Sequence, residues 1–279
     1  MRNVWPRRNF LELASIVFPS YLLGLEPRLF GLAPQEQRNS SSSAPVSSAP
    51  VADLFPTQPP ELAREMVTVS HYDLKRVKEL VEARPSLARA AWDWGFGDWE
   101  DALGAASHMG NRPIAEFLNS KGARPSLFSS AMLGHLEIVK AFVAAQPTVQ
   151  RIQGPHSISL LAHAKAGGQA SRPVFEFLQS LGDADSDQVV PLSDSESGSI
   201  VGSYGFGPAI NQQIDVAVDH GGVSWTRKGM MGRQLFHLGS RVFYPGGAPA
   251  VRIRFREEGS TMQMSIEDSV LVLLARRKQ

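Results

Sequence analysis

The side chains that could do acid–base chemistry or hold a metal ion are the carboxylates and seven histidines, because the chain contains no cysteine. That absence excludes disulfides, thiolate metal sites and a cysteine nucleophile. His156 and His163 are seven residues apart and could share one face of a helix. No pair of histidines has the His-x-x-x-His spacing with a glutamate base, so we predict no metal site and no cofactor. We interpret His156 as a capping or core residue.

Catalytic motifs are missing as well. The sequence has no Gly-x-Ser-x-Gly nucleophile elbow, and its Gly-Phe-Gly and Gly-Gly-Gln segments lack the Lys-Ser/Thr sequel of a phosphate-binding loop. A formal charge of +1 does not indicate a nucleic-acid partner. We therefore predict a chain that is not an enzyme.

An aromatic segment, residues 91–100, is the most unusual stretch of the chain. It places three of the five tryptophans within eight positions and includes two glycines for tight turns. Tryptophan is over-represented among the residues that dominate interface energies. We predict that the partner-binding residues are Trp92, Trp94, Phe96, Asp98, Trp99 and His108. The alternative is a hydrophobic plug that seals the neighbouring helices, in which case the tryptophans belong to the core.

Pairs of short helices are predicted on both sides of this segment. Residues 100–123 contain an alanine-rich helix, a glycine turn and a second helix with Ile114, Phe117 and Leu118 at i, i+3 and i+4. The same apolar triplet recurs three times, and its first positions, Val77, Ile114, Ile138 and Val174, lie 37, 24 and 36 residues apart. We expect all of these apolar residues to lie in the core.

The turns between these helices carry a family resemblance. Ala105-Ala106-Ser107-His108-Met109-Gly110, Gly134-His135 and the Gly122-Ala123 ending resemble the hinge and the end of an ankyrin repeat, whose regular period is about 33 residues. The resemblance implies about four irregular repeats over residues 59–185, stacked as an α-helical solenoid with a concave groove for a protein or peptide. It implies that the segment at residues 91–100 is a finger beside that groove, with His71 and His108 on the groove side.

The last part of the chain changes to alternating polar and apolar residues. Eight short strands are predicted, at 200–204, 213–218, 222–227, 233–238, 241–244, 250–256, 261–266 and 270–275, with glycine turns between several of them. The pattern indicates an antiparallel meander closed into a small barrel or sandwich over residues 199–279. It resembles the lipocalin-like β domain appended to bacterial β-lactamase-like serine hydrolases, although the hydrolase domain itself has no counterpart here. The predicted fold class is therefore α+β and multidomain, an ankyrin-repeat solenoid followed by a small antiparallel β-barrel or sandwich.

The N-terminal residues predict where in the cell the protein is located. Arg7-Arg8 precede a moderately apolar run, residues 13–25, and resemble the core of a bacterial twin-arginine export signal. We predict an export signal at residues 1–34, a Ser/Ala/Pro-rich linker at 35–58 and an acidic linker at 186–198. The expected location is periplasmic or otherwise exported, without a stable membrane span in the mature protein. The alternatives are an amphipathic extension and a cytoplasmic location.

Two functions remain open at this point. The first is an exported ankyrin-repeat module without catalytic activity, which binds a protein or peptide through the groove and the tryptophan-rich segment. The second is a small-ligand-binding protein or enzyme accessory, in which Trp225, Phe236 and Phe243 line the interior of the barrel and hold an apolar compound. A barrel interior filled by side chains would speak against the second function.

Overall fold

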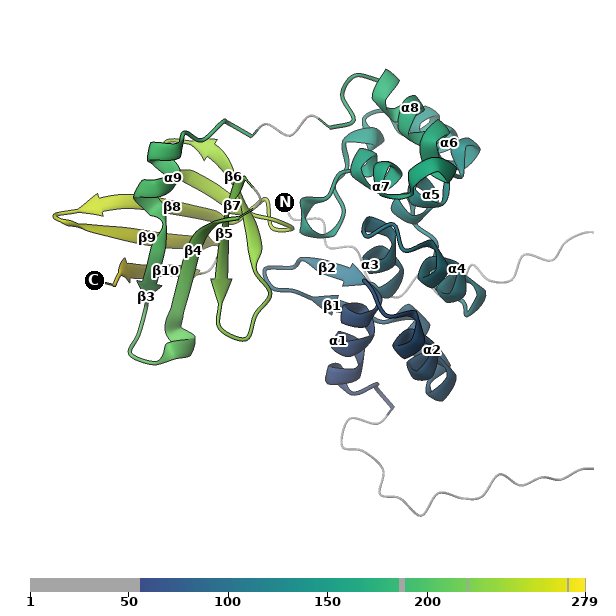
Figure 1. The fold of residues 1–279 in the computed structure, drawn as a ribbon, viewed down its shortest axis with the longest axis horizontal. Helices are drawn as coiled ribbons and strands as arrows, with labels where there is room; N and C mark the ends of the chain where they lie inside the picture. Colours follow the sequence, from purple (N-terminus) through teal and green to yellow (C-terminus); the bar gives the residue numbers. More distant parts are fainter. Residues whose placement is uncertain (1–55, 186–188, 220, 270, 279) are drawn as a thin grey trace, which may run out of the picture. The chain divides into compact units, whose positions relative to one another are not determined.

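The structure is a computed structural model that describes residues 56–185, 189–219, 221–269 and 271–278. The predicted export signal and most of the Ser/Ala/Pro-rich linker lie outside the described residues. Everything that is described belongs to one compact unit, Ala52–Gln279. Within it, helices come first along the chain and a β-barrel follows (Figure 1).

The first part consists of helix pairs that alternate with short 3₁₀ segments. The α-helices are α1 (Pro60–Val69), α2 (Leu74–Ala83), α3 (Ala102–His108), α4 (Arg112–Ser120), α5 (Leu127–Leu133), α6 (Leu136–Ala145), α7 (Leu160–Ala166) and α8 (Arg172–Ser180). The 3₁₀ segments are η1 (Pro85–Arg89), η2 (Val149–Arg151), η3 (Pro155–Ser157) and η4 (Gly168–Ser171). Polar caps start several of these helices: Asp73 accepts the backbone N–H of Arg76 at α2, and Ser126 and Ser129 form a capping box at α5.

The predicted fold class was wrong in its first part, because the helical region is not an ankyrin-repeat solenoid. A hairpin connection occurs among the described helices only once, at the predicted finger, as strands β1 (Ala91–Asp93) and β2 (Trp99–Asp101). The short step between Ile114 and Ile138 leaves no room for a second hairpin, so the capping box at Ser126 starts α5 directly after a turn. The longer connection from α6 to α7 is built from η2, η3 and an isolated bridge between Gln153 and Ser159.

Most of the apolar triplets lie in the core as predicted, with one exception. Val77, Ile114 and Val174 are fully buried on α2, α4 and α8. Ile138 is 45% exposed on α6, whereas its neighbour Val139 is buried. The register of α6 therefore differs by one residue from the expected one.

The second part is a closed antiparallel barrel, which confirms the predicted β-barrel. The strands are β3 (Gly202–Gly205), β4 (Gln213–Asp219), β5 (Gly222–Arg227), β6 (Arg233–Gly239), β7 (Val242–Pro245), β8 (Arg252–Glu258), β9 (Thr261–Asp268) and β10 (Leu271–Arg277). They pair in the order β10-β3-β4-β5-β6-β7-β8-β9. Each pairs with its sequence neighbour, and β10 closes the barrel on β3. A short 3₁₀ segment, η5 (Ile210–Gln212), precedes β4.

Aromatic side chains pack inside the barrel. The ring of Phe255 lies 5.5 Å from Tyr204 and 5.7 Å from Phe243, both in edge-on contacts between ring centroids. Tyr204 also donates its hydroxyl to the backbone oxygen of Ile200, 2.6 Å away, at the end of helix α9 (Asp194–Ile200). This helix lies partly within the expected acidic linker and begins with a capping box between Ser193 and Glu196.

Candidate functional site

The β1–β2 hairpin projects a loop whose backbone needs glycine. Gly95 and Gly97 adopt φ angles of 114° and 78°, and Phe96 between them has a φ of 57°. The carboxylate of Asp93 accepts the backbone N–H of Gly95 at 2.7 Å, and the N–H of Asp98 donates to the Gly95 oxygen at 3.2 Å. These bonds hold three successive residues in the left-handed region, where only glycine is unstrained. The loop therefore presents the Phe96 side chain in a fixed place.

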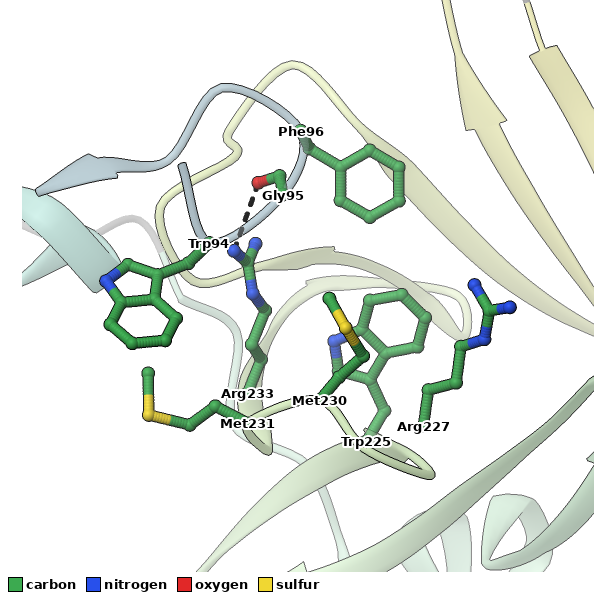
Figure 2. A pocket seen from close by; sticks show the side chains of 8 residues that line it. All are labelled: Trp94, Gly95, Phe96, Trp225, Arg227, Met230, Met231 and Arg233. Carbon is green, nitrogen blue, oxygen red and sulfur yellow. Dashed lines mark hydrogen bonds between the residues drawn. The ribbon is translucent and has the colours of Figure 1, made fainter. Parts of the chain in front are cut away.

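Phe96 forms one wall of a pocket shared with the barrel. Its ring stacks on Trp225 of β5 with centroids 6.1 Å apart and planes 19° from parallel. Figure 2 shows these two rings with the other lining residues: Trp94, Gly95, Phe96, Trp225, Arg227, Met230, Met231 and Arg233. The pocket encloses about 230 Å³. Sites for whole small molecules usually enclose about 300–1,000 Å³, so this one suits a single bulky side chain.

The pocket is apolar at its mouth, and one of its lining residues, Trp225, carries a buried donor without a partner in the described part of the chain. Met230 is 50% exposed and Met231 44% exposed, in the turn between β5 and β6. The indole N–H of Trp225 is buried and has no hydrogen-bond partner among the described residues. A buried donor without an acceptor costs about 1–3 kcal/mol. The exposed methionines and the aromatic walls therefore favour an apolar occupant.

Arg233 of β6 joins the hairpin loop to the barrel. Its guanidinium donates to the Gly95 oxygen at 3.0 Å (Figure 2). It also donates to the Gly246 oxygen at 3.2 Å and lies 3.3 Å from the Asp98 carboxylate. Burial lowers the pKa of Arg233, against the opposing effect of Asp98. An arginine stays protonated in proteins even so, and this one fixes the floor of the pocket.

Behind the hairpin, imidazoles gather around the fully buried carboxylate of Glu100 in β2. His108, the last residue of α3, has its Nε2 2.9 Å from Glu100 Oε1. The Nε2 atoms of His71, in the α1–α2 turn, and His156, in η3, lie 3.5 and 3.4 Å from Glu100 Oε2. The indole N–H of Trp94 donates to Glu100 Oε2 at 2.8 Å. Trp94 therefore contacts the pocket on one side and this cluster on the other.

Burial and the neighbouring groups shift the pKa values in this cluster and so determine which side chains are charged. Burial alone would raise the pKa of Glu100, but the surrounding imidazoles of His108, His156 and His71 outweigh it and lower that pKa to about 2. Burial opposes the charged form of His156 too, but the hydrogen bond to Asp98 and the nearby carboxylate of Glu100 raise the pKa to about 9. Burial lowers the pKa of His71, and it lowers that of the nearby His163 to about 4. At neutral pH the groups around the hairpin are thus an ionised Glu100, a charged His156 and two neutral histidines.

The backbone is strained where the barrel and helices meet the cluster. His156 and Ser157 have φ angles of 60° and 61°, which costs about 1–3 kcal/mol for each such residue. Asp98 holds this conformation: one oxygen accepts the His156 backbone N–H at 3.0 Å and the other pairs with its Nδ1 at 2.8 Å. Ser157 accepts the N–H of Gly247 from the barrel at 2.8 Å. Strain maintained in this way is common at functional sites.

The structure divides the six predicted site residues into three groups. Trp94 and Phe96 line the pocket, whereas Asp98 and His108 belong to the buried polar cluster. Trp92 is half-buried with the Arg64 guanidinium 6.0 Å from its ring, and Trp99 is 64% exposed; neither lines the pocket.

Residues outside the six predicted ones complete both sites, among them Trp225, which was predicted to line the interior of the barrel. The pocket takes Trp225, Arg227, Met230, Met231 and Arg233 from the barrel, and the cluster takes His71, Glu100 and His156. A signal for the pocket was present in Gly229-Met230-Met231-Gly232, since two methionines between glycines in a turn are exposed apolar residues. The spacing of the histidines carried no comparable signal.

Comparison with family models, with curated proteins and with solved structures found no match. In the part of the chain that the structure describes, no helix has both the length and the apolar character needed to cross a membrane.

Proposed function

We propose that this chain is a non-catalytic binding protein that takes a bulky apolar side chain and an adjoining carboxylate of a protein or peptide partner. The site is the pocket between the β1–β2 hairpin and the barrel. The observation that carries the proposal is the stacked pair Phe96–Trp225, whose buried indole N–H lacks an acceptor among the described residues.

Shape and apolar surface support one side chain as the occupant. Aromatic rings and methionines form the wall and the mouth, and methionine adapts to partners of different shape. Burying one large apolar side chain contributes about 1.5–3 kcal/mol. Such a gain is modest, so polar contacts must supply the rest of the affinity and the specificity.

Charge supports a carboxylate beside that side chain. Arg227 at the pocket edge is exposed, with its Nε donating to the Asn211 oxygen at 2.7 Å and its guanidinium 5.4 Å from the Phe206 ring. Its Nη groups have no hydrogen-bond partner in the described parts of the chain and can pair with an anion. The buried indole N–H of Trp225 lacks a partner among the described residues and becomes a second donor if the ring turns toward an occupant. Together they match a carboxylate or a backbone carbonyl next to an apolar side chain.

The packing of the barrel favours this proposal over a ligand in the barrel interior. Tyr204, Phe243 and Phe255 contact one another inside, and Trp225 lines the external pocket instead. Phe236 stacks on Tyr244 with centroids 4.9 Å apart. Phe236 and Phe243 also line a separate hollow of about 310 Å³ beside the segment 189–192, so what opposes a ligand in the interior is the aromatic packing of the barrel core. Export to the periplasm stays a prediction.

The proposal can be tested by calorimetric titration with short peptides. The probe is a flexible glycine/serine peptide that carries an aspartate followed by a phenylalanine, with versions in which asparagine or alanine replaces one of the two. Loss of the charge should weaken binding about 10- to 100-fold, because hydrogen bonds to charged groups contribute about 1.5–3 kcal/mol. Trp225→Ala and Met230→Ser should abolish measurable binding.

Trp99→Ala is the matched control, since it removes an exposed tryptophan of the same hairpin outside the pocket. It should bind as the wild type does. Met230 is exposed, so its replacement leaves the fold intact and separates lost binding from lost structure. Equal affinities for the wild type and Met230→Ser, or for all three peptides, would refute the proposed pocket.

A further inference from the structure

The buried cluster behind the hairpin has the composition of a metal site. His71, Glu100, His108 and His156 each direct one ligand atom to a common region, and these four atoms all lie within 4.8 Å of one another. They come from four separate elements: the α1–α2 turn, β2, α3 and η3. Side chains that converge in this way from distant parts of a chain need a reason beyond local packing.

The ligand atoms are close together without forming aligned hydrogen bonds. Glu100 Oε1 and the Nε2 atoms of His108 and His156 are buried and have no hydrogen-bond partner among the described residues. This holds although His108 Nε2 is only 2.9 Å from Glu100 Oε1. The side chain of Glu100 is fully buried and that of His108 is 8% exposed. Unpartnered polar atoms this deeply buried are costly unless something else satisfies them.

Hydrogen bonds on the far sides of two imidazoles set their tautomers. The Nδ1 of His71 donates to the backbone oxygens of Val67 and Thr68, both at 3.0 Å. The Nδ1 of His156 pairs with the Asp98 carboxylate at 2.8 Å. Each arrangement directs Nε2 to the centre of the cluster, and on His156 this atom becomes a lone-pair donor when a metal ion displaces its proton. Metal-binding histidines typically have such a partner on the other ring nitrogen.

The distances fit a small tetrahedral ion. Zinc–nitrogen bonds of about 2.0–2.1 Å place two ligands of a tetrahedron roughly 3.3 Å apart. Glu100 Oε1 lies 2.9 Å from His108, and Oε2 lies 3.5 and 3.4 Å from His71 and His156, on either side of that value; the four candidate ligand atoms are at most 4.8 Å apart and must draw together around the ion. The side chains of His71 and His156 are 15% and 19% exposed, so they are the ligands nearest to solvent.

We infer that His71, His108, His156 and Glu100 bind a divalent first-row transition metal, with three imidazoles and one carboxylate as ligands. Three nitrogens and one oxygen suit Zn²⁺, whereas Ca²⁺ and Mg²⁺ prefer ligand sets made of oxygen. Four protein ligands close the coordination shell, which is typical of a structural centre. The ion links the hairpin to α3, to the α1–α2 turn and to η3, and this role does not depend on what the neighbouring pocket binds.

The experiment is metal binding by the full chain after treatment with a chelator. Zn²⁺ is titrated by calorimetry, retained metal is measured after gel filtration, and Co²⁺ is added as a spectroscopic probe of tetrahedral nitrogen and oxygen ligands. The wild type should hold one equivalent of Zn²⁺, melt at a higher temperature with it, and give the visible absorption of four-coordinate Co²⁺. Asp98→Asn, which alters the partner of His156, should weaken affinity about 10- to 100-fold.

Two ligand variants and one control decide the outcome. Glu100→Gln and His108→Gln should lose the stoichiometric metal and the metal-induced rise in melting temperature. His135→Gln, at an exposed histidine that starts α6, should bind as the wild type does. Melting in chelator shows separately whether each variant is folded. A wild type that retains no Zn²⁺, or folded Glu100→Gln that retains as much as His135→Gln, would overturn the inference.

Discussion

Replacing Gly247 by alanine is expected to destabilise the protein by disturbing the contact between the barrel and the hairpin. Gly247 lies in the β7–β8 turn with a φ of 80°, and a methyl group built on it would overlap the carboxylate of Asp98. That carboxylate holds His156 and Arg233, so it has little freedom to move. The left-handed backbone costs a residue with a Cβ about 1–2 kcal/mol, and overpacking at a tight contact costs about 1–3 kcal/mol more. Gly247→Ala should therefore lower the free energy of unfolding by about 2–5 kcal/mol.

A second glycine of the barrel isolates the contribution of the contact. Gly259, in the β8–β9 turn, has a φ of 63°, and a methyl group there would meet nothing within 4 Å. Gly259→Ala should cost only the backbone part, about 1–2 kcal/mol. Urea unfolding of both variants and the wild type, followed by tryptophan fluorescence, measures the difference. Equal destabilisation by the two substitutions would refute the close approach of the Gly246–Gly247 turn to Asp98.

Two further predictions address the barrel and the export of the chain. Tyr204→Phe should cost about 1–3 kcal/mol of unfolding free energy in the same urea assay, because it leaves the Ile200 oxygen without its donor inside the fold. Tyr72→Phe, at a side chain that is 67% exposed, should change stability by less than about 0.5 kcal/mol, and a similar loss in both variants would contradict the role given to the Tyr204 hydroxyl. Replacing Arg7 and Arg8 by lysine should abolish export in cell fractionation, and equal periplasmic yield would remove the twin-arginine interpretation.

Local sequence patterns predicted the barrel well, because each strand has its own signal. Alternation placed the strand at 222–227 within the observed bounds of β5, and the strand at 213–218 matched β4 to within one residue. The alternating positions in β9 point into the core, as shown by buried Met262, Met264 and Ile266. Period-two alternation reports which face is buried, and short turns leave few other ways to pair the strands.

In the helical part, local sequence patterns predicted several helices but not the connections between them. Apolar triplets located α2, α4 and α8, yet they say nothing about the connections, and the connections are what distinguish this fold from an ankyrin-repeat solenoid. An apolar triplet also predicts the buried face of a helix only to within one residue. In α6 the predicted Ile138 is exposed and its neighbour Val139 is buried instead. Helix α9 went unpredicted although Ser193 and Glu196 form a recognisable capping box.

Only some residues of the candidate sites could be predicted from the sequence, because each site is assembled from distant parts of the chain. Arg233 reaches the Gly95 oxygen across 138 positions, a distance over which no local motif extends. The tryptophan-rich hairpin stood out by composition and does line the pocket through Trp94 and Phe96. His71 and His156 reach Glu100 only because the turns that carry them pack around β2. The spacing of the histidines along the chain gives no sign of this cluster.

The most direct test of the proposed binding site is the indole N–H signal of Trp225 in two-dimensional ¹H–¹⁵N NMR. This signal can be assigned by comparison with Trp225→Ala. The peptide with aspartate and phenylalanine should shift the Trp225 indole signal in a saturable manner, because its acceptor fills the missing hydrogen bond. The Trp99 indole, exposed outside the pocket, should stay where it is. An unchanged Trp225 signal at saturating peptide, or equal shifts for both tryptophans, would contradict the account.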